Sequence, residues 1–125
     1  MGCLVDTHAL LWSLEDSAQL PLSARTMMLQ NAGEVFFSAA SVYELEYKSV
    51  LGKLPAWPKR VAALAEAAGF FALPISIDDA ETAARLPVVV RDPWDRLIAA
   101  QALRGGLTVI TRDEAIARLG AAVFW

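Results

Sequence analysis

The feature that most constrains this chain is a regular alternation of short apolar runs with helical patterns along its whole length. Short runs rich in Val, Ile, Leu and Phe are typical of buried parallel strands. The segments between them place apolar side chains three and four positions apart, which predicts amphipathic helices. Strands that alternate with helices build right-handed βαβ units. The sequence therefore predicts an α/β fold with a central parallel sheet flanked by helices.

The expected elements follow from these patterns and from the Gly and Pro residues that interrupt them. Predicted strands cover residues 3–5, 35–37, 71–75, 107–110 and 122–124. Predicted helices comprise one that contains Leu10, Leu11 and Leu14, and others over residues 23–31, 41–50, 58–68, 78–86, 93–105 and 113–119. The length of 125 residues and the lack of repeats or linkers predict a single domain over residues 1–125.

The chain is 56% apolar, yet its longest apolar runs are too short to span a bilayer. This excess indicates buried protein contacts. The first residues lack the basic segment and continuous apolar stretch of a signal peptide, so we expect a cytoplasmic protein. Cys3 is the only cysteine, which rules out an internal disulfide and a cysteine-rich zinc site, and we expect it to be buried in the first strand.

Several acids fall where parallel strands end. Asp6 follows the first predicted strand, and Asp113 follows the strand over 107–110. Glu44 lies one helical turn beyond the second strand, and Asp95 lies in the first turn of the long helix. Because the carboxyl ends of parallel strands meet at one edge of the sheet, we expect these four carboxylates to converge.

Four converging carboxylates repel one another unless a cation neutralises them. Oxygen-only ligands favour a hard divalent ion, so the sequence predicts a Mg²⁺ or Mn²⁺ site. Such a site suits phosphodiester hydrolysis, because the metal activates a water and stabilises charge on the phosphate.

The net charge of −3 argues at first against a nucleic-acid partner. Without the four acids of the predicted site, however, 10 of the 14 acidic side chains remain against 11 basic ones. The overall charge is therefore compatible with RNA binding, although it does not indicate RNA by itself.

Four motifs carry a resemblance to a known family. They occupy residues 5–12, 38–45, 91–102 and 108–113 and contain the four acids in order. Together they resemble the acidic motifs of PIN-domain ribonucleases, and the first and third are similar to those of the VapC-like toxins of toxin–antitoxin pairs.

The resemblance implies that Asp6, Glu44, Asp95 and Asp113 are the catalytic metal ligands. It further implies a metal-dependent endoribonuclease, an RNA substrate, a homodimer and inhibition by a cognate antitoxin. Hydroxyls beside the acids are candidates for orienting the ligands, and nearby basic residues are candidates for phosphate contacts. The hydroxyl candidates are Thr7, Ser38 and Thr111, and the basic candidates are Lys48, Arg91, Arg96 and Arg112.

Each of these residues also has a purely structural alternative. Asp6 and Asp113 are possible helix N-caps, and residues 41–44 match a capping box with Glu44 at its end. Asp92, directly before Pro93, is the expected N-cap of the long helix, and whether it also assists the site stays open. The hydroxyls are ordinary turn formers, and the basic side chains are possibly only solvated.

Two further residues have expected roles outside the metal chemistry. His8 is the only histidine, and we expect a structural or substrate-adjacent role rather than a general base. Trp57, between Pro55 and Pro58, is the expected contact with an antitoxin or a second subunit.

Other classes fit less well. A response-regulator receiver needs adjacent acids after its first strand and a Lys after its fifth, but the chain has no Lys beyond Lys59. A haloacid-dehalogenase-like phosphatase needs Asp-x-Asp where this chain has Asp6-Thr7-His8. The serious alternative is a PIN fold that binds RNA or a protein without cleaving.

Overall fold

The structure is a computed structural model that describes residues 2–125. Its strands form one sheet in the order β3-β2-β1-β4-β5, and every neighbouring pair is parallel. The predicted α/β fold with a central parallel sheet is therefore confirmed. The strands are β1 (Cys3–Val5), β2 (Val35–Ser38), β3 (Phe71–Leu73), β4 (Thr108–Ile110) and β5 (Val123–Phe124).

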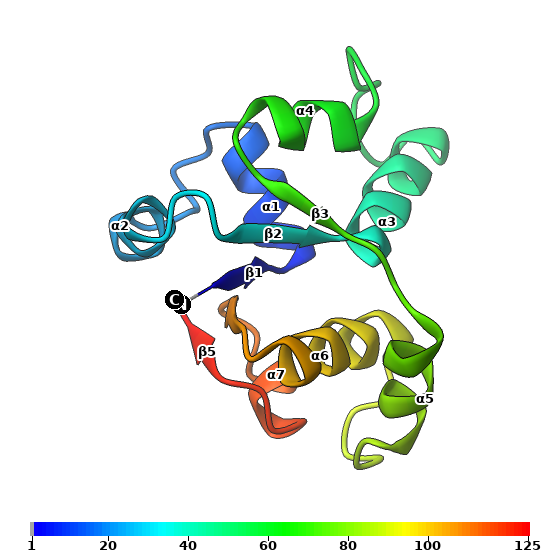
Figure 1. Cartoon of the computed structure of the whole chain (residues 1–125). Helices are drawn as coiled ribbons and strands as arrows, with labels where there is room; N and C mark the ends of the chain where they lie inside the picture. Colours follow the sequence, from blue (N-terminus) through cyan, green and yellow to red (C-terminus); the bar gives the residue numbers. More distant parts are fainter. Residues whose placement is uncertain (1) are drawn as a thin grey trace.

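Helices cover both faces of the sheet (Figure 1). The helices α1, α2, α3 and α4 lie on one side, and α5, α6 and α7 lie on the other (Figure 1). Their bounds are α1 (Thr7–Leu14), α2 (Leu22–Gln30), α3 (Ala39–Val50), α4 (Val61–Ala67), α5 (Ile77–Arg85), α6 (Pro93–Gly105) and α7 (Glu114–Arg118). None of the helices within residues 2–125 is long and apolar enough to cross a membrane.

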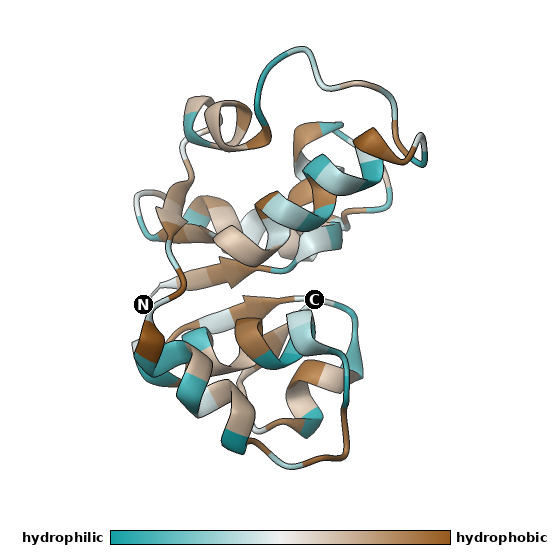
Figure 2. Cartoon of the chain, turned by 90° about the vertical axis from the view of Figure 1, so that its right-hand side faces the viewer, coloured by the Kyte–Doolittle hydropathy of each residue, from teal (hydrophilic) through white to brown (hydrophobic). Residues whose placement is uncertain are grey.

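The alternation of side chains along β1 divides the core into two halves. Cys3 and Val5 pack with the α1, α2, α3 and α4 side, whereas Leu4 packs with α6 and α7. Cys3 is fully buried with a free thiol, as expected. Figure 2 shows the strands as largely hydrophobic ribbon between helices of mixed hydropathy.

Most predicted element boundaries are within a few residues of the observed ones. The starts of α3 and α4 differ from the prediction for reasons that specific hydrogen bonds show. Helix α3 begins at Ala39 rather than residue 41, because the Ser38 side chain accepts a hydrogen bond from the Ala40 amide and caps the helix. Helix α4 begins at Val61 rather than residue 58. There the Val61 amide donates to Glu46 Oε2 of α3, which fixes the first turn.

Helix α6 has the predicted ends. Asp92 caps it, Pro93 occupies its first turn, and Gly106 ends it in the left-handed conformation with φ of 64°. A residue with a Cβ pays a steric cost in that conformation, so the glycine sets where the helix stops and β4 begins.

Candidate metal centre at the carboxyl edge of the sheet

Asp6 directly follows β1, the central strand, and its carboxylate is held from two sides. One oxygen, Oδ1, accepts a hydrogen bond of 2.7 Å from the Ala9 amide, which caps α1. The other, Oδ2, accepts a short hydrogen bond of 2.5 Å from the Thr111 hydroxyl. Burial raises the pKa of Asp6, although these two hydrogen bonds act in the opposite direction. Asp6 is therefore the N-cap of α1, and the same carboxylate is the one that the sequence predicts as a metal ligand.

Thr111 and Asp113 follow β4, the neighbour of β1. The buried Thr111 hydroxyl donates to Asp6 and accepts from the Asp113 amide at 2.9 Å. Asp113 in turn caps α7 by accepting from the Ala115 amide at 2.9 Å. Thr111 therefore orients Asp6 and fixes the loop that carries Asp113.

Glu44 lies on α3, and its two carboxylate oxygens have different partners. Thr7 donates a 3.2 Å hydrogen bond to Glu44 Oε1, and Lys48 forms a 3.0 Å ion pair with Glu44 Oε2. The capping-box alternative for Glu44 is wrong, because Ser38 and not Ser41 caps α3. The buried Ser41 hydroxyl instead shares a 3.0 Å hydrogen bond with Thr7 and so fixes the contact between α1 and α3.

Asp92 and Asp95 occupy the start of α6. Asp92 Oδ1 accepts hydrogen bonds from the amides of Trp94 and Asp95, at 2.8 and 3.1 Å. Burial raises the pKa of Asp95 to about 6, and the charges of Asp92, Asp113, Asp6 and Glu44 add to that rise. The Asp95 carboxyl is therefore close enough to each of the other acids for their charges to raise its pKa.

The acids share one cavity of about 130 Å³. It is lined by Asp6, Thr7, His8, Glu44, Asp92, Asp95, Ile98 and Asp113. All four acids that the sequence predicts for the site are therefore brought together, and Asp92 joins them.

The donor set of this cavity fits a hard divalent cation, because every acidic ligand offers oxygen and mutual repulsion is what a cation relieves. Within residues 2–125, no three His, Cys, Asp or Glu side chains already form a metal-ligand group. In this arrangement Lys48 forms an ion pair with Glu44 Oε2, and Asp6 accepts hydrogen bonds from Thr111 and the Ala9 amide. Loading the site would require at least Glu44 to exchange its ion pair for the metal.

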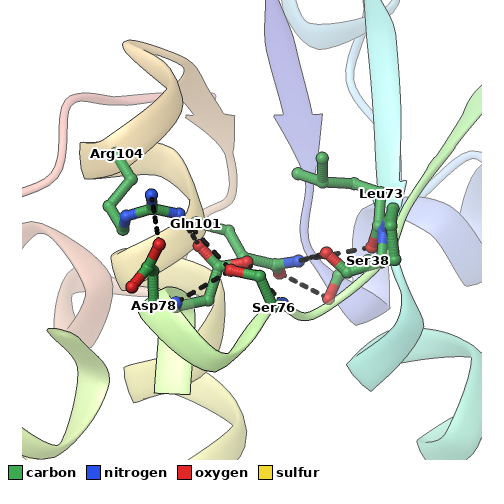
Figure 3. A network of polar contacts seen from close by, with 8 residues as sticks. Ser38, Leu73, Ser76, Asp78, Gln101 and Arg104 are labelled. Atoms are coloured by element: carbon green, nitrogen blue, oxygen red, sulfur yellow. Dashed lines mark hydrogen bonds and ion pairs between the residues drawn. The ribbon is translucent and has the colours of Figure 1, made fainter. Parts of the chain in front are cut away.

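Ser38 does not contact the acids, contrary to its predicted role beside them. Its buried hydroxyl donates a 2.6 Å hydrogen bond to Gln101 Oε1 of α6, as Figure 3 shows. Gln101 Nε2 donates to the carbonyls of Leu73 and Pro74, at 3.3 and 3.2 Å. Gln101 thereby ties α6, which carries Asp95, to the ends of β2 and β3.

Arg96 is also placed differently from its predicted phosphate contact. Its guanidinium donates to four backbone carbonyls, namely those of Ala84, Leu86, Pro87 and Val90. Ala84 lies in the last turn of α5 and the other three residues follow the helix, where carbonyls lack helical partners. Arg96 therefore stabilises the loop before α6 and is occupied there.

The other basic candidates differ in their distance from the acids. Lys48 is at the site through its ion pair with Glu44. Arg112 lies over the Trp12 ring, 4.7 Å from its centroid, and lines a second cavity together with Asp6 and Asp113. Arg91 is exposed in the loop before α6. His8 is exposed and lines the acid cavity.

Trp57 has a structural partner that the sequence did not indicate. Its indole Nε1 donates to the Leu45 carbonyl at 3.2 Å, and its ring packs against the core while half-buried. Trp57 therefore has a structural role within the domain, and its contact with an antitoxin or a second subunit stays a prediction.

The sequence matches the PIN domain family over residues 3–122. This chain belongs to the PIN domain family. The four acids predicted for the site, which line the cavity together with Asp92, all lie within the matched residues. No curated protein sequence matches the chain.

Solved structures with the fold of this PIN domain include chains from toxin–antitoxin complexes. A chain of the DNA-bound VapBC structure from Salmonella typhimurium has a TM-score of 0.76 and 21% identity, over 99% of this PIN domain and 97% of its own length. A chain of VapBC2 from Rickettsia felis, bound to a promoter DNA fragment, has a TM-score of 0.72 and 15% identity, with coverages of 99% and 98%. A chain of FitAcB from Neisseria gonorrhoeae has a TM-score of 0.66 and 25% identity, with coverages of 98% and 96%.

Proposed function

We propose that this PIN domain is a Mg²⁺- or Mn²⁺-dependent endoribonuclease and the toxin of a toxin–antitoxin pair. The observation that carries the proposal is the shared cavity of Asp6, Glu44, Asp95 and Asp113 at the carboxyl edge of the sheet. An all-oxygen acidic site of this kind suits metal-assisted hydrolysis of a phosphodiester. A bound divalent ion would supply an activated water and would neutralise charge on the scissile phosphate.

The protein side chains supply orientation and charge. Thr111 and the Ala9 amide hold Asp6, while Thr7 holds one oxygen of Glu44, so that two ligands are fixed before substrate arrives. Lys48 pairs with Glu44, and if that carboxylate were to bind a metal, the Lys48 ammonium would be available for an RNA phosphate. Arg91 is the further candidate for a phosphate contact, whereas Arg112 lines the second cavity beside the acids and is a candidate for contact with another part of the RNA.

Several features support the toxin assignment. The similar chains come from VapBC structures, from FitAcB and from a toxin–antitoxin complex of Klebsiella pneumoniae. We propose on this basis a cognate antitoxin that covers the acidic site with a basic side chain, a cytoplasmic location and a homodimer. Expression of this protein alone should arrest growth, and co-expression of the antitoxin should relieve the arrest.

The deciding experiment is cleavage of a mixed RNA pool with Mn²⁺ and with EDTA. Wild-type protein should cleave only with Mn²⁺, and Asp6→Asn should lose cleavage by orders of magnitude while it keeps the cap of α1. Asp78→Asn, which changes an exposed acid at the start of α5, is the matched control and should cleave like wild type. Wild-type protein that binds the pool but never cleaves it would favour the non-catalytic binding module.

A further inference from the structure

A second cavity adjoins the acid cavity. Its volume is about 250 Å³, and its lining residues are Asp6, His8, Trp12, Arg112, Asp113 and Trp125. Three of these residues, Asp6, His8 and Asp113, line the acid cavity as well. A group bound in the second cavity therefore lies directly beside the carboxylates.

Aromatic rings form much of this second cavity. Trp12 is buried, and its ring is in contact with the rings of His8 and Trp125, at centroid distances of 5.4 and 5.8 Å. His8 is exposed and Trp125 is half-buried, so both leave ring surface open to a ligand. Rings at the edge of a cavity of this kind are stacking surfaces for a planar group.

Arg112 adds hydrogen-bond donors to the same cavity. Its guanidinium forms a cation–π contact with Trp12, with the central carbon 4.7 Å from the ring centroid. Among the described residues 2–125, the guanidinium has no hydrogen-bond acceptor and no ion-pair partner, unlike Arg25, Arg96 and Arg104. Its N–H groups are therefore held in place by the indole and are available to a ligand.

We propose that this second cavity, the Trp12–Trp125 pocket, binds an unpaired nucleobase next to the scissile phosphodiester. The proposal rests on the proposed ribonuclease function. The pocket offers aromatic faces, donors on Arg112 and acceptor oxygens on Asp113, and a nucleobase combines a planar ring with acceptor and donor edges. A phosphate fits this pocket poorly, because Asp6 and Asp113 place two carboxylates in its wall. The pocket thereby selects the base at the cleavage site, while the acids act on the adjacent phosphate.

The test compares base preference at the cut in an RNA pool of random sequence, with cleaved ends read by sequencing. Wild-type protein should show a base enriched at a position next to the cut. Trp125→Leu and Arg112→Gln should flatten that enrichment, whereas Trp125→Phe should retain it because the stacking ring is kept. Phe71→Leu, which changes a half-exposed ring on the far edge strand β3, should leave the enrichment unchanged.

Binding is measured separately in the Asp95→Asn background, which prevents cleavage. A short oligoribonucleotide with a single 2-aminopurine should lose fluorescence when its base stacks in the pocket. We expect about tenfold weaker binding and less quenching with Trp125→Leu, and near-parental values with Trp125→Phe and Phe71→Leu.

These two measurements separate the pocket from the catalytic proposal. Wild-type protein that cleaves no RNA but shows Trp125-dependent quenching would contradict the ribonuclease and support the base pocket. Active protein whose base enrichment and quenching are the same in Trp125→Leu and Arg112→Gln would overturn the pocket. If both variants lose only antitoxin affinity, the pocket receives a protein side chain and the nucleobase proposal is wrong.

Discussion

Asp92 and Asp95 stand in the same first turn of α6, yet their carboxylates differ in their partners. Asp92 accepts two backbone amides, whereas the Asp95 carboxylate accepts no hydrogen bond within residues 2–125 and is surrounded by other acids. This environment supports the proposed role of Asp95 as a metal ligand.

We therefore expect opposite results from the two acids. Asp95→Asn should reduce metal-dependent cleavage by orders of magnitude without loss of stability. Asp92→Asn should keep the fold and much of the activity, because Asn also caps helices, and Asp92→Ala should cost about 1 kcal/mol of unfolding free energy. Cleavage rates and urea unfolding of the three variants check this. Abolished cleavage in Asp92→Asn together with intact cleavage in Asp95→Asn would mean that the ligand is misassigned.

The pKa of Asp95 also predicts how stability depends on pH. In the folded state this pKa is raised to about 6 from 3.8, so the folded protein binds the proton more tightly than the unfolded chain. The resulting stability is present below pH 3.8 and is lost as pH rises through 6. In EDTA at pH 7, Asp95→Asn should thus unfold at a higher urea concentration than wild type. Its free energy of unfolding should be higher by about 1–2 kcal/mol after allowance for solvent screening. At pH 4 the two should be nearly equal; an advantage that persists there would contradict the raised pKa.

The acids could be predicted from the sequence because each lies shortly after a strand or within the first two turns of a helix. Parallel strands place those positions together. The partners of Ser38 and Arg96 could not. Ser38 bonds Gln101, which is 63 positions away, and Arg96 bonds carbonyls whose direction depends on how the loop after α5 turns. No local pattern encodes such contacts.

At the scale of elements, Gln101 links three parts of the fold. It is 2% exposed within the small apolar stripe of α6, and it bonds Ser38 at the end of β2 and two carbonyls after β3. In the sequence, the signal for this link was a Gln in a run of Ile and Ala residues expected to be buried, since a buried amide needs polar partners.

Gln101→Leu should destabilise the protein by roughly 2–4 kcal/mol, because it leaves buried polar groups of β2 and β3 without partners. Gln30→Leu makes the same chemical change at an exposed position of α2 and should change stability by under about 0.5 kcal/mol. Urea unfolding measures both. Equal effects of the two substitutions would show that the link adds nothing to stability.

The starts of α6 and α4 differ in how far they could be predicted from the sequence. The start of α6 was predicted from Asp92 and Pro93, two residues adjacent in sequence that fix the helix by local bonding. The start of α4 was not, since Glu46 of α3 supplies the acceptor for its first amide. A helix that is begun by a distant side chain has no signature at its own start.

At the scale of the whole molecule, the acids should make stability depend on metal. Millimolar Mg²⁺ or Mn²⁺ should raise the melting temperature of wild-type protein, because an ion that binds only the folded state stabilises it. Asp6→Asn should remove most of this shift, and Asp78→Asn should retain it. A wild-type melting temperature that neither ion changes would contradict a shared metal site.

Exposed apolar side chains on α3 support the proposed homodimer. Tyr43 is 53% and Tyr47 48% exposed, their rings stack at 5.6 Å, and Val50 continues the face at 80% exposure. Sedimentation at micromolar concentration should show a dimer, and Tyr47→Glu should shift it toward monomer. A monomeric wild type would leave this face to the antitoxin.

The hydrogen bond between Thr111 and Asp6 joins positions 105 residues apart, and β1 pairs with β4 directly beside it. A ribosome synthesising this protein therefore releases Asp6 long before the segment that orients it. Until residues 111–113 have emerged and β4 has docked against β1, the nascent chain holds an incomplete acidic site. For the ribonuclease that we propose, this order of synthesis delays activity until the domain is nearly finished, which gives an antitoxin made nearby time to be present when the first active molecule folds.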